Sequence, residues 1–400
     1  MSEFDKRLIP EVNIGTLGHV DHGKSTLVEA ITGKWTSQHS EELKRGITIK
    51  LGYADATIYK CHKCGDYYSQ DKCPKDFEIC EPQRTVSFVD APGHETLMAT
   101  VLAGANLMDG VLFVIAANER CPQPQSKEHL MVLNIVQQKN TIIVQTKIDL
   151  VSREQALENY KQIKEFVKGS VAENSPIIPV SAKQKINLEF LLKEIQERIK
   201  TPYHDETKPA RMYVVRSFDI NKPGTEIENL KGGVLGGALV QGKFRIGDEI
   251  DIKPGLFYKN KMTQLKTKII GLQKAGKDLE EAGSGGLLGV LTELDPSITK
   301  ADSLAGSLGG KNLSDAIHNI ALKVNLFDKL LEDRIEPIRQ GEQLMLNVGT
   351  ARTIGVVKNL KKDNVDFDLR LPVSAEKEDR VVLSRRISDR WRLIGWGLIK

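Results

Sequence analysis

The chain has 400 residues, of which 40% are hydrophobic and 28% are charged, and its formal net charge is +4 at pH 7. This is ordinary composition for a globular protein of roughly two to four domains, and the small positive excess leaves only local patches for nucleic-acid contact. No early apolar run resembles a signal peptide, and no stretch approaches about 18 apolar residues, so secretion and membrane spanning are not expected. We expect a cytoplasmic protein.

The first chemical motif is a phosphate-binding loop between a strand and a helix. Residues 12–17 predict a buried strand, a helix is predicted to begin near Ser25, and Gly18–Ser25 match G-x-x-x-x-G-K-[ST] at every specified position. Backbone N–H groups and the helix N-terminus bind phosphates there, Lys24 adds positive charge, and the Ser25 hydroxyl is a Mg²⁺ ligand. A chance match is expected in about one chain in a hundred of this length. The expected nucleotide-binding residues of the loop are His19, Val20, Asp21, His22, Gly23, Lys24, Ser25 and Thr26.

Strands and helices alternate from this loop to about residue 200. Alternation of this kind predicts an α/β domain with a parallel sheet, in which loops at the carboxyl ends of the strands carry the chemistry. The further strands are expected at 85–89, 110–116, 141–145 and 177–180, and the helices at 97–107, 126–137, 154–167 and 188–199.

Two later segments have the residue types that sense a γ-phosphate. The first, Asp90-Ala-Pro-Gly93, follows a predicted strand, so Asp90 can reach Mg²⁺ through water and the Gly93 N–H can bond the phosphate. Thr48, in the loop after the first helix, can ligate Mg²⁺ only while that phosphate is present. Loss of the phosphate would release the segment after Gly93, which is an order–disorder switch. Each pattern is weak alone, and an ordinary turn is the alternative.

A further pair of loops predicts that the base is guanine. In Thr146-Lys147-Ile148-Asp149, the Asp149 carboxylate can accept hydrogen bonds from the guanine N1–H and 2-amino groups, and Lys147 can lie along the base. Adenine offers neither donor, and such sites reject the wrong partner by roughly 10⁴-fold or more. Ser181, Ala182 and Lys183 can aim backbone N–H groups at the guanine O6, although Ser181 can also be a helix N-cap. We therefore expect GTP and GDP as the ligands.

The composition changes at a polar, proline-bounded linker over residues 201–209. Short β-like runs separated by glycines follow it, and they predict two all-β domains. We expect a GTP-binding domain over residues 1–204, with a cysteine-rich insertion at 60–82, followed by β-barrel domains over 205–314 and 315–400.

Four of the five cysteines lie within the insertion. Thiolates at this density in a chain without a signal peptide favour a metal over disulfides. A closed tetrahedral Zn²⁺ site with a structural role is predicted, with free thiols as the alternative. The expected ligands are Cys61, Cys64, Cys73 and Cys80.

The order of the loops resembles that of the translational GTPases, whose first motif commonly reads GHVDHGK[ST] and whose second reads D-x-P-G-H. The resemblance implies that His94 positions the attacking water, so that His94, Lys24 and Gly93 form the catalytic set. Over nearly the whole chain, the sequence is similar to the gamma subunit of archaeal and eukaryotic initiation factor two, and its length favours the archaeal form. This similarity is carried by Ser40–Thr48, Ala116–Glu119, Pro122–Gln125, Arg216–Gly224, Leu294–Asp302, Val348–Arg352 and Arg390–Gly397.

By this resemblance, the chain carries methionylated initiator tRNA to the small ribosomal subunit when GTP is bound. It works as a heterotrimer with alpha and beta subunits, and it releases the tRNA after start-codon selection and hydrolysis. Lysines and arginines near the C-terminus are available for tRNA phosphates, although a solvated face is an equal alternative. These are Lys361, Lys362, Arg380, Arg385, Arg386, Arg390 and Arg392.

Two features depart from the family pattern. The base-reading motif normally begins with Asn, whose amide braces the phosphate loop and bonds the base, whereas the Thr146 hydroxyl lacks that reach. We predict weaker but retained GTP binding, which Thr146→Asn should tighten. The second cysteine pair is often another C-x2-C in the family but is stretched here to Cys73-x6-Cys80.

Hydrolysis of GTP needs positive charge beyond Lys24 and Mg²⁺. Arg45 is the nearest candidate among the arginines, and a solvated or structural role suits it better than a catalytic one. We therefore predict slow intrinsic hydrolysis that a ribosomal complex or partner accelerates.

Two other kinds of protein share the plan of a GTPase domain followed by barrels. One is an elongation factor that delivers other aminoacyl-tRNAs, including the selenocysteine-specific kind, and the motifs after residue 216 argue against it. The other is the GTP-dependent large subunit of ATP sulfurylase.

Overall fold

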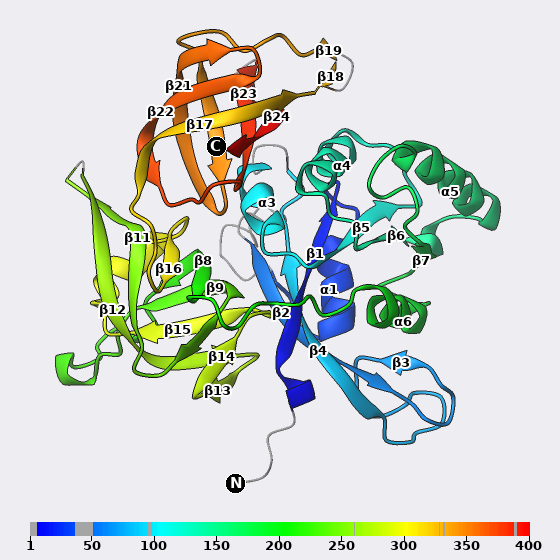
Figure 1. Ribbon diagram of the computed structural model, residues 1–400. Coiled ribbons are helices and arrows are strands. Elements are labelled where there is room, and N and C mark those ends of the chain that lie inside the picture. The colour runs from blue at the N-terminus through cyan, green and yellow to red at the C-terminus, as the bar shows by residue number, and fades with distance from the viewer. Residues whose placement is uncertain are drawn as a thin grey trace. The chain divides into compact units, whose positions relative to one another are not determined.

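The structure is a computed structural model that describes residues 6–36, 51–94, 98–259, 261–327, 329–330, 333–387 and 390–400 (Figure 1). The chain divides into two compact units, Met1–Pro202 and Tyr203–Lys400. None of the helices in the described part of the chain is long and apolar enough to cross a membrane.

The first unit is built on a seven-stranded sheet with the order β3-β2-β4-β1-β5-β6-β7. Strands β4, β1, β5, β6 and β7 are parallel, whereas β2 runs antiparallel to β4, and β3 antiparallel to β2. The sheet is therefore mixed, and the expectation of a parallel sheet is wrong at one edge. Its strands are β1 (Pro10–Gly18), β2 (Gly52–Lys60), β3 (Tyr67–Tyr68), β4 (Glu81–Asp90), β5 (Gly110–Ala116), β6 (Thr141–Thr146) and β7 (Ile177–Pro179).

The cysteine-rich insertion explains the antiparallel edge. It joins β2 directly to β4, and antiparallel neighbours need no helical crossover, whereas parallel ones do. The hairpin that it forms places the insertion at the end of the sheet where β2 ends and β4 begins.

The helices of the first unit lie where the sequence pattern predicts them, within three residues at each described end. In α5, Ser152 and Gln155 form a capping box that fixes its start, and α1 ends at Gly33, whose left-handed backbone (φ 69°) lets its N–H bond the Glu29 carbonyl at 2.7 Å. Helix α1 contacts β1, β2 and β4, and α4 contacts β1. The helices are α1 (Lys24–Thr32), α3 (Met98–Ala105), α4 (Pro124–Val136), α5 (Arg153–Val167) and α6 (Leu188–Arg198).

The centre of the sheet is covered on both faces. Every residue of β5 and β6 is buried, as is typical of central parallel strands that are covered on both faces. This rigid centre fixes the carboxyl ends of β1, β4, β5 and β6 side by side, since Thr16 pairs with Asp90, Gly18 with Val114, and Ala116 with Thr146.

The second unit contains two β-barrels, as expected. In the first, six strands form the ring β11-β16-β8-β9-β15-β12, which closes because β12 also pairs with β11. Strand β13 (Lys277–Leu279) extends from β12, and β10 (Lys243–Arg245) pairs with β14 (Glu281–Gly283). The ring strands are β8 (Arg211–Phe218), β9 (Val234–Gln241), β11 (Glu249–Tyr258), β12 (Lys261–Lys274), β15 (Leu288–Thr292) and β16 (Leu308–Gly310).

The second barrel is a closed ring in the order β17-β22-β21-β20-β23-β24. Closure leaves no free sheet edge, and the pairing that completes the ring joins β17 to β24, with Leu322 opposite Ile399. Phe367 is the largest fully buried side chain of its core. The strands are β17 (Ile317–Leu326), β20 (Gln343–Val348), β21 (Ala351–Lys361), β22 (Asn364–Val373), β23 (Arg380–Ile387) and β24 (Arg390–Ile399), with a small ribbon of β18 (Lys329–Leu330) and β19 (Asp333–Arg334).

Ion pairs connect the two barrels. Arg211 on β8 donates to Asp379 at 2.9 Å and lies 3.0 Å from Glu376, both in the turn between β22 and β23. In the segment that connects β16 to β17, the Asp315 carboxylate and the Leu313 carbonyl accept hydrogen bonds from Lys253 on β11, each at 2.8 Å. The Arg211 side chain is only 8% exposed, so the barrels are joined by a charge that is largely removed from water.

Candidate nucleotide site and metal centre

The phosphate loop connects β1 to α1 and surrounds a buried lysine. Lys24 begins α1, directly after Gly23, whose left-handed backbone (φ 86°) allows the turn. The Lys24 ammonium donates to the carbonyl oxygens of Gly18 at 3.0 Å and His19 at 2.7 Å. Burial lowers the pKa of Lys24 to about 8, while Asp90 and Asp21 act in the opposite direction, so the side chain is still mainly charged at pH 7.

A buried carboxylate lies next to this loop. Asp90, at the end of β4, accepts hydrogen bonds from the hydroxyls of Ser25 at 2.5 Å, Thr36 at 2.6 Å and Thr16 at 2.7 Å. Two of the predicted magnesium ligands, Ser25 and Asp90, are thus in contact. A hydroxyl and a carboxylate are the hard oxygen donors that Mg²⁺ prefers, so these residues fit the ion. The third, Thr48, lies outside the described residues, as does Arg45.

The loop after β4 packs closely against the phosphate loop. A Cβ on Gly93 would lie 2.5 Å from the Lys24 ammonium, 2.9 Å from the Val20 nitrogen and 3.1 Å from the His19 carbonyl carbon. Any side chain at this position would therefore displace the loop or the lysine. His94 follows directly and is half-buried.

Two buried histidines support the phosphate loop from behind. The backbone N–H of Gly18 donates to Nδ1 of His129, on α4, at 2.7 Å. His22 has Nδ1 3.2 Å from the Val114 carbonyl oxygen and Nε2 3.4 Å from the Glu119 carboxylate. Burial lowers the pKa of both histidines to about 3, so both are neutral at pH 7 and His129 can accept the bond. Sequence reasoning missed His129, because it lies within an ordinary amphipathic helix.

Thr146 braces the phosphate loop directly. Its hydroxyl donates to the His22 carbonyl oxygen at 2.7 Å, so the expectation that this side chain lacks the reach is wrong for the loop contact. The next residue, Lys147, has a left-handed backbone (φ 57°) and precedes the 3-10 turn Ile148–Leu150, which places Asp149 on the surface.

The last predicted loop lies beside this one. The Val180 N–H donates to the Gln145 carbonyl at 2.8 Å, which brings residues 181–183 next to 146–149 at the same end of the sheet. The Ser181 hydroxyl accepts from the Gln184 N–H at 3.1 Å, so it caps the turn 181–186, and helix α6 begins later, at Leu188. The backbone N–H of Ser181 bonds the Ile186 carbonyl, which leaves Ala182 and Lys183 as the loop's available donors.

The described loops thus meet at the carboxyl ends of β1, β4, β6 and β7, where α/β sheets bind nucleotides. Lys24, the pair of Ser25 and Asp90, and Gly93 lie close together. The Asp149 carboxylate lies on the surface after β6. Such a set can hold the phosphates and the base of a nucleotide.

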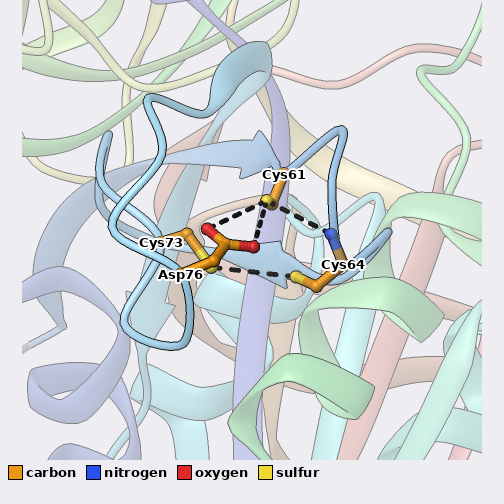
Figure 2. A group of neighbouring side chains, drawn as sticks. All are labelled: Cys61, Cys64, Cys73 and Asp76. Carbon is orange, nitrogen blue, oxygen red and sulfur yellow. Dashed lines mark hydrogen bonds between the residues drawn. The ribbon is translucent and has the colours of Figure 1, made fainter.

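A second group of ligand-type side chains lies in the cysteine-rich insertion. Figure 2 shows Cys61, Cys64, Cys73 and Asp76 pointing toward one another, and one ligand atom of each lies within 4.8 Å of all the others. Three of the four predicted cysteines are therefore together, Asp76 is with them, and Cys80 is not part of the group. Three thiols and a carboxylate at these separations fit a divalent metal ion.

Two known families match different parts of the chain. Residues 10–201 match the family Elongation factor Tu GTP binding domain, and residues 318–399 match Initiation factor eIF2 gamma, C terminal. Among solved structures, the fold is similar to the bacterial selenocysteine-specific elongation factor EF-Sec (TM-score 0.76, 23% identity, 98% of this chain and 58% of that one). It also resembles the elongation factor SelB from Methanococcus maripaludis (TM-score 0.73, 22% identity, 98% and 79%).

Full-length relatives are more similar in sequence. The chain is 55% identical to the translation initiation factor 2 subunit gamma of Methanothermobacter thermautotrophicus, over 98% of this chain and 99% of the relative. It is 56% identical to that of Methanocaldococcus jannaschii (98% and 97%) and 55% identical to that of Pyrococcus horikoshii (100% and 100%). The chain therefore belongs to the family of translation initiation factor 2 gamma subunits and is a translational GTPase.

Proposed function

We propose that the chain carries methionylated initiator tRNA to the small ribosomal subunit while GTP is bound, and releases it after hydrolysis to GDP and phosphate. The observation that carries the proposal is full-length similarity to translation initiation factor 2 gamma subunits, together with the convergence of the predicted loops around Lys24. EF-Sec and SelB share the fold at below 25% identity, so they support the architecture alone.

The residues proposed for nucleotide binding lie in three of these loops. The phosphate loop binds the phosphates, Asp149 and Lys147 the base, and Ala182 and Lys183 the guanine O6, with Thr146 and Ser181 holding their loops in place. The proposed magnesium ligands are Ser25 and Asp90, with Thr48 as a third. When bound, Mg²⁺ neutralises charge on the β- and γ-phosphate oxygens.

Each catalytic residue has a separate role in this proposal. Lys24, which the loop carbonyls hold in place, stabilises the negative charge that develops during phosphoryl transfer. The Gly93 N–H bonds the γ-phosphate, which the close contact between its loop and the phosphate loop makes possible. His94 orients the attacking water. No cis arginine is assigned in the described residues, so we expect hydrolysis to be slow until a ribosomal complex supplies the missing charge.

The partners and setting follow from the same proposal. We propose a heterotrimer with alpha and beta subunits, cytoplasmic localisation, and three domains over residues 1–204, 205–314 and 315–400. We also propose a structural Zn²⁺ in the cysteine-rich insertion, where it would brace the hairpin between β2 and β4 without taking part in catalysis.

The decisive experiment measures retention of tRNA by the complex of this chain with its alpha subunit. Methionylated initiator tRNA and an aminoacylated elongator tRNA are compared, each with GTP and with GDP. Selective retention of the initiator with GTP is the expected result. Equal retention of both tRNAs, or retention that ignores the nucleotide, would contradict the proposal.

A further inference from the structure

We propose that Asp76, and not Cys80, is the fourth metal ligand in the cysteine-rich insertion, so that Zn²⁺ is held by three thiolates and one carboxylate. The proposal deepens the zinc site proposed above and is independent of the nucleotide site and of tRNA binding.

The first argument is the geometry of the turn that contains Cys61 and Cys64. The Cys61 N–H donates to the Asp66 carbonyl at 3.0 Å, and the Gly65 N–H donates back to the Cys61 carbonyl at 2.9 Å. Gly65 has a left-handed backbone (φ 78°), and the Cys64 N–H points at the Cys61 sulfur from 3.5 Å. The turn thereby directs two sulfurs, three residues apart, to the same side.

A second turn repeats this geometry twelve residues further along the chain. The Cys73 N–H donates to the Glu78 carbonyl at 2.9 Å, and the Phe77 N–H donates back to the Cys73 carbonyl at 3.0 Å. Phe77 occupies the left-handed position (φ 62°) although it is not glycine, so the turn is held against a local preference for other backbone angles. In this repeat Cys73 corresponds to Cys61, and Asp76 corresponds to Cys64.

The distances agree with a tetrahedral zinc site made by these two turns. With Zn–S near 2.3 Å, two thiolates of a tetrahedron lie about 3.8 Å apart, and with Zn–O near 2.0 Å a thiolate and a carboxylate oxygen lie about 3.5 Å apart. The sulfurs of Cys64 and Cys73 are 3.7 Å apart, and the Cys61 sulfur is 3.4 Å from the nearer Asp76 oxygen. One ion can therefore reach all four atoms with little rearrangement (Figure 2).

Cys80 lies beside this group rather than within it, although its thiol still interacts with that of Cys61. It follows the second turn, its N–H donates to the Asp71 carbonyl at 2.7 Å, and its sulfur lies 3.9 Å from the Glu78 carbonyl oxygen. The side chain is buried and packs with Cys61, Cys73 and Tyr68. We assign it the role of a small apolar side chain that fills the base of the insertion.

Replacing one thiolate by a carboxylate has chemical consequences. The charge of the donor set is unchanged, because both groups carry one negative charge when they bind metal. Oxygen is a harder ligand than sulfur, so the site should hold soft ions such as Cd²⁺ less tightly than four thiolates would. The variant Asp76→Cys should therefore bind Cd²⁺ more tightly than the natural chain.

X-ray absorption at the zinc edge, measured on the full-length chain loaded with Zn²⁺, counts the sulfur ligands directly. We expect three sulfurs and one oxygen in the natural chain and in Cys80→Ser, and four sulfurs in Asp76→Cys. Zinc affinity, measured by chelator competition, should fall more than about 100-fold in Asp76→Ala, since even loss of an outer-shell partner costs 10–100-fold. In Cys80→Ser it should stay within a few-fold of the natural value.

Four sulfurs in the natural chain that become three in Cys80→Ser would overturn the assignment, as would substoichiometric zinc in the natural chain. GTP affinity is measured in parallel for each variant, and a natural value shows that the rest of the unit is folded. For any variant that does not fold, Co²⁺ absorption of the isolated natural chain still distinguishes three thiolates from four. Loss of initiator tRNA binding would bear only on the proposed function.

Discussion

The two units of this molecule both bury charged and polar groups, but they use them differently. In the first unit these groups converge on one end of a sheet, where Asp90 collects three hydroxyls and Lys24 is held by loop carbonyls. In the second, the buried cation Arg211 joins one barrel to the other, and Lys253 binds the segment that connects them. Removing water from a charge is unfavourable in both places. In the first unit the buried groups form a binding site, and in the second they hold the two barrels together. Mutations of these groups should therefore change nucleotide binding in the first unit and the free energy of unfolding in the second.

The largest effect on binding is expected at the guanine-reading carboxylate. Asp149→Asn replaces an acceptor of two hydrogen bonds by an amide that presents a donor, so GTP affinity should fall roughly 10⁴-fold. Xanthosine triphosphate, which offers a carbonyl in place of the 2-amino group, should gain affinity. Titration with labelled nucleotides measures both, with Glu197→Gln on the exposed face of α6 as the control. A variant that keeps its preference for GTP would remove Asp149 from the site.

Acid should destabilise the first unit before the second. The pKa of His22 and of His129 is about 3 in the folded chain because of burial, against about 6.5 when unfolded, so the unfolded chain binds their protons first. Above pH 6.5 the two neutral histidines do not reduce the free energy of unfolding of the first unit. As the pH falls from 6.5 toward 3, this free energy decreases by up to about 2.7 kcal/mol per pH unit when both histidines contribute.

Hydrogen exchange of each unit, followed from pH 7 to pH 4, tests this difference. His129→Gln should reduce the slope for the first unit by about half, since one of the two groups is removed. The control is Asn174→Ala, which changes an exposed side chain without a titratable group and should leave the slope unchanged. If both units lose protection in parallel, the two histidines do not control the acid response.

The link between the barrels should contribute to stability alone. Arg211→Met leaves Glu376 and Asp379 without their shared cation, and we expect the free energy of unfolding of the second unit to fall by about 2 kcal/mol. This is below the 3–5 kcal/mol seen for fully buried pairs, because Glu376 is half exposed. Denaturant unfolding measures the change, and Arg245→Met, at an exposed pair with Glu281, should have little effect. A change in GTP affinity in Arg211→Met would contradict the separation of roles.

The smallest effect is expected at Thr146. Its hydroxyl already braces the phosphate loop, so Thr146→Asn adds only the contact to the base and should tighten GTP binding about threefold to tenfold. Thr146→Ser should keep the natural affinity, and Thr146→Val should weaken it because the His22 carbonyl loses its partner. An unchanged dissociation constant for Thr146→Asn would show that the family's asparagine makes no further bond here.

Periodicity and local motifs predicted much of the architecture. The apolar run Gly110–Ala116 and the amphipathic helix Leu188–Arg198 were recognisable because their patterns are long and regular. The antiparallel position of β2 was not, because strand direction depends on a connection, and here that connection is the insertion.

The sites show the same limit. Lys24, Asp90 and Gly93 belong to contiguous motifs, whereas His129 and Thr36 reach the nucleotide site from distant segments whose sequence has no special pattern. The spacing of Cys73 and Asp76 repeats that of Cys61 and Cys64, and this repeat was the available signal for the carboxylate ligand. A search for cysteine pairs alone does not find Asp76, because the residue at this position is an aspartate.

The closure of the second barrel also has a consequence for how the chain is made. One edge of β17 finds its partner only in β24, whose pairing extends to Ile399, while the ring of the first barrel is complete at Gly310. At 5–20 residues per second, the ribosome needs roughly 4–15 s to extend the chain from the end of β17 to Ile399. For that time the nascent chain presents an unpaired strand edge. Chaperone contacts during synthesis should therefore concentrate on β17.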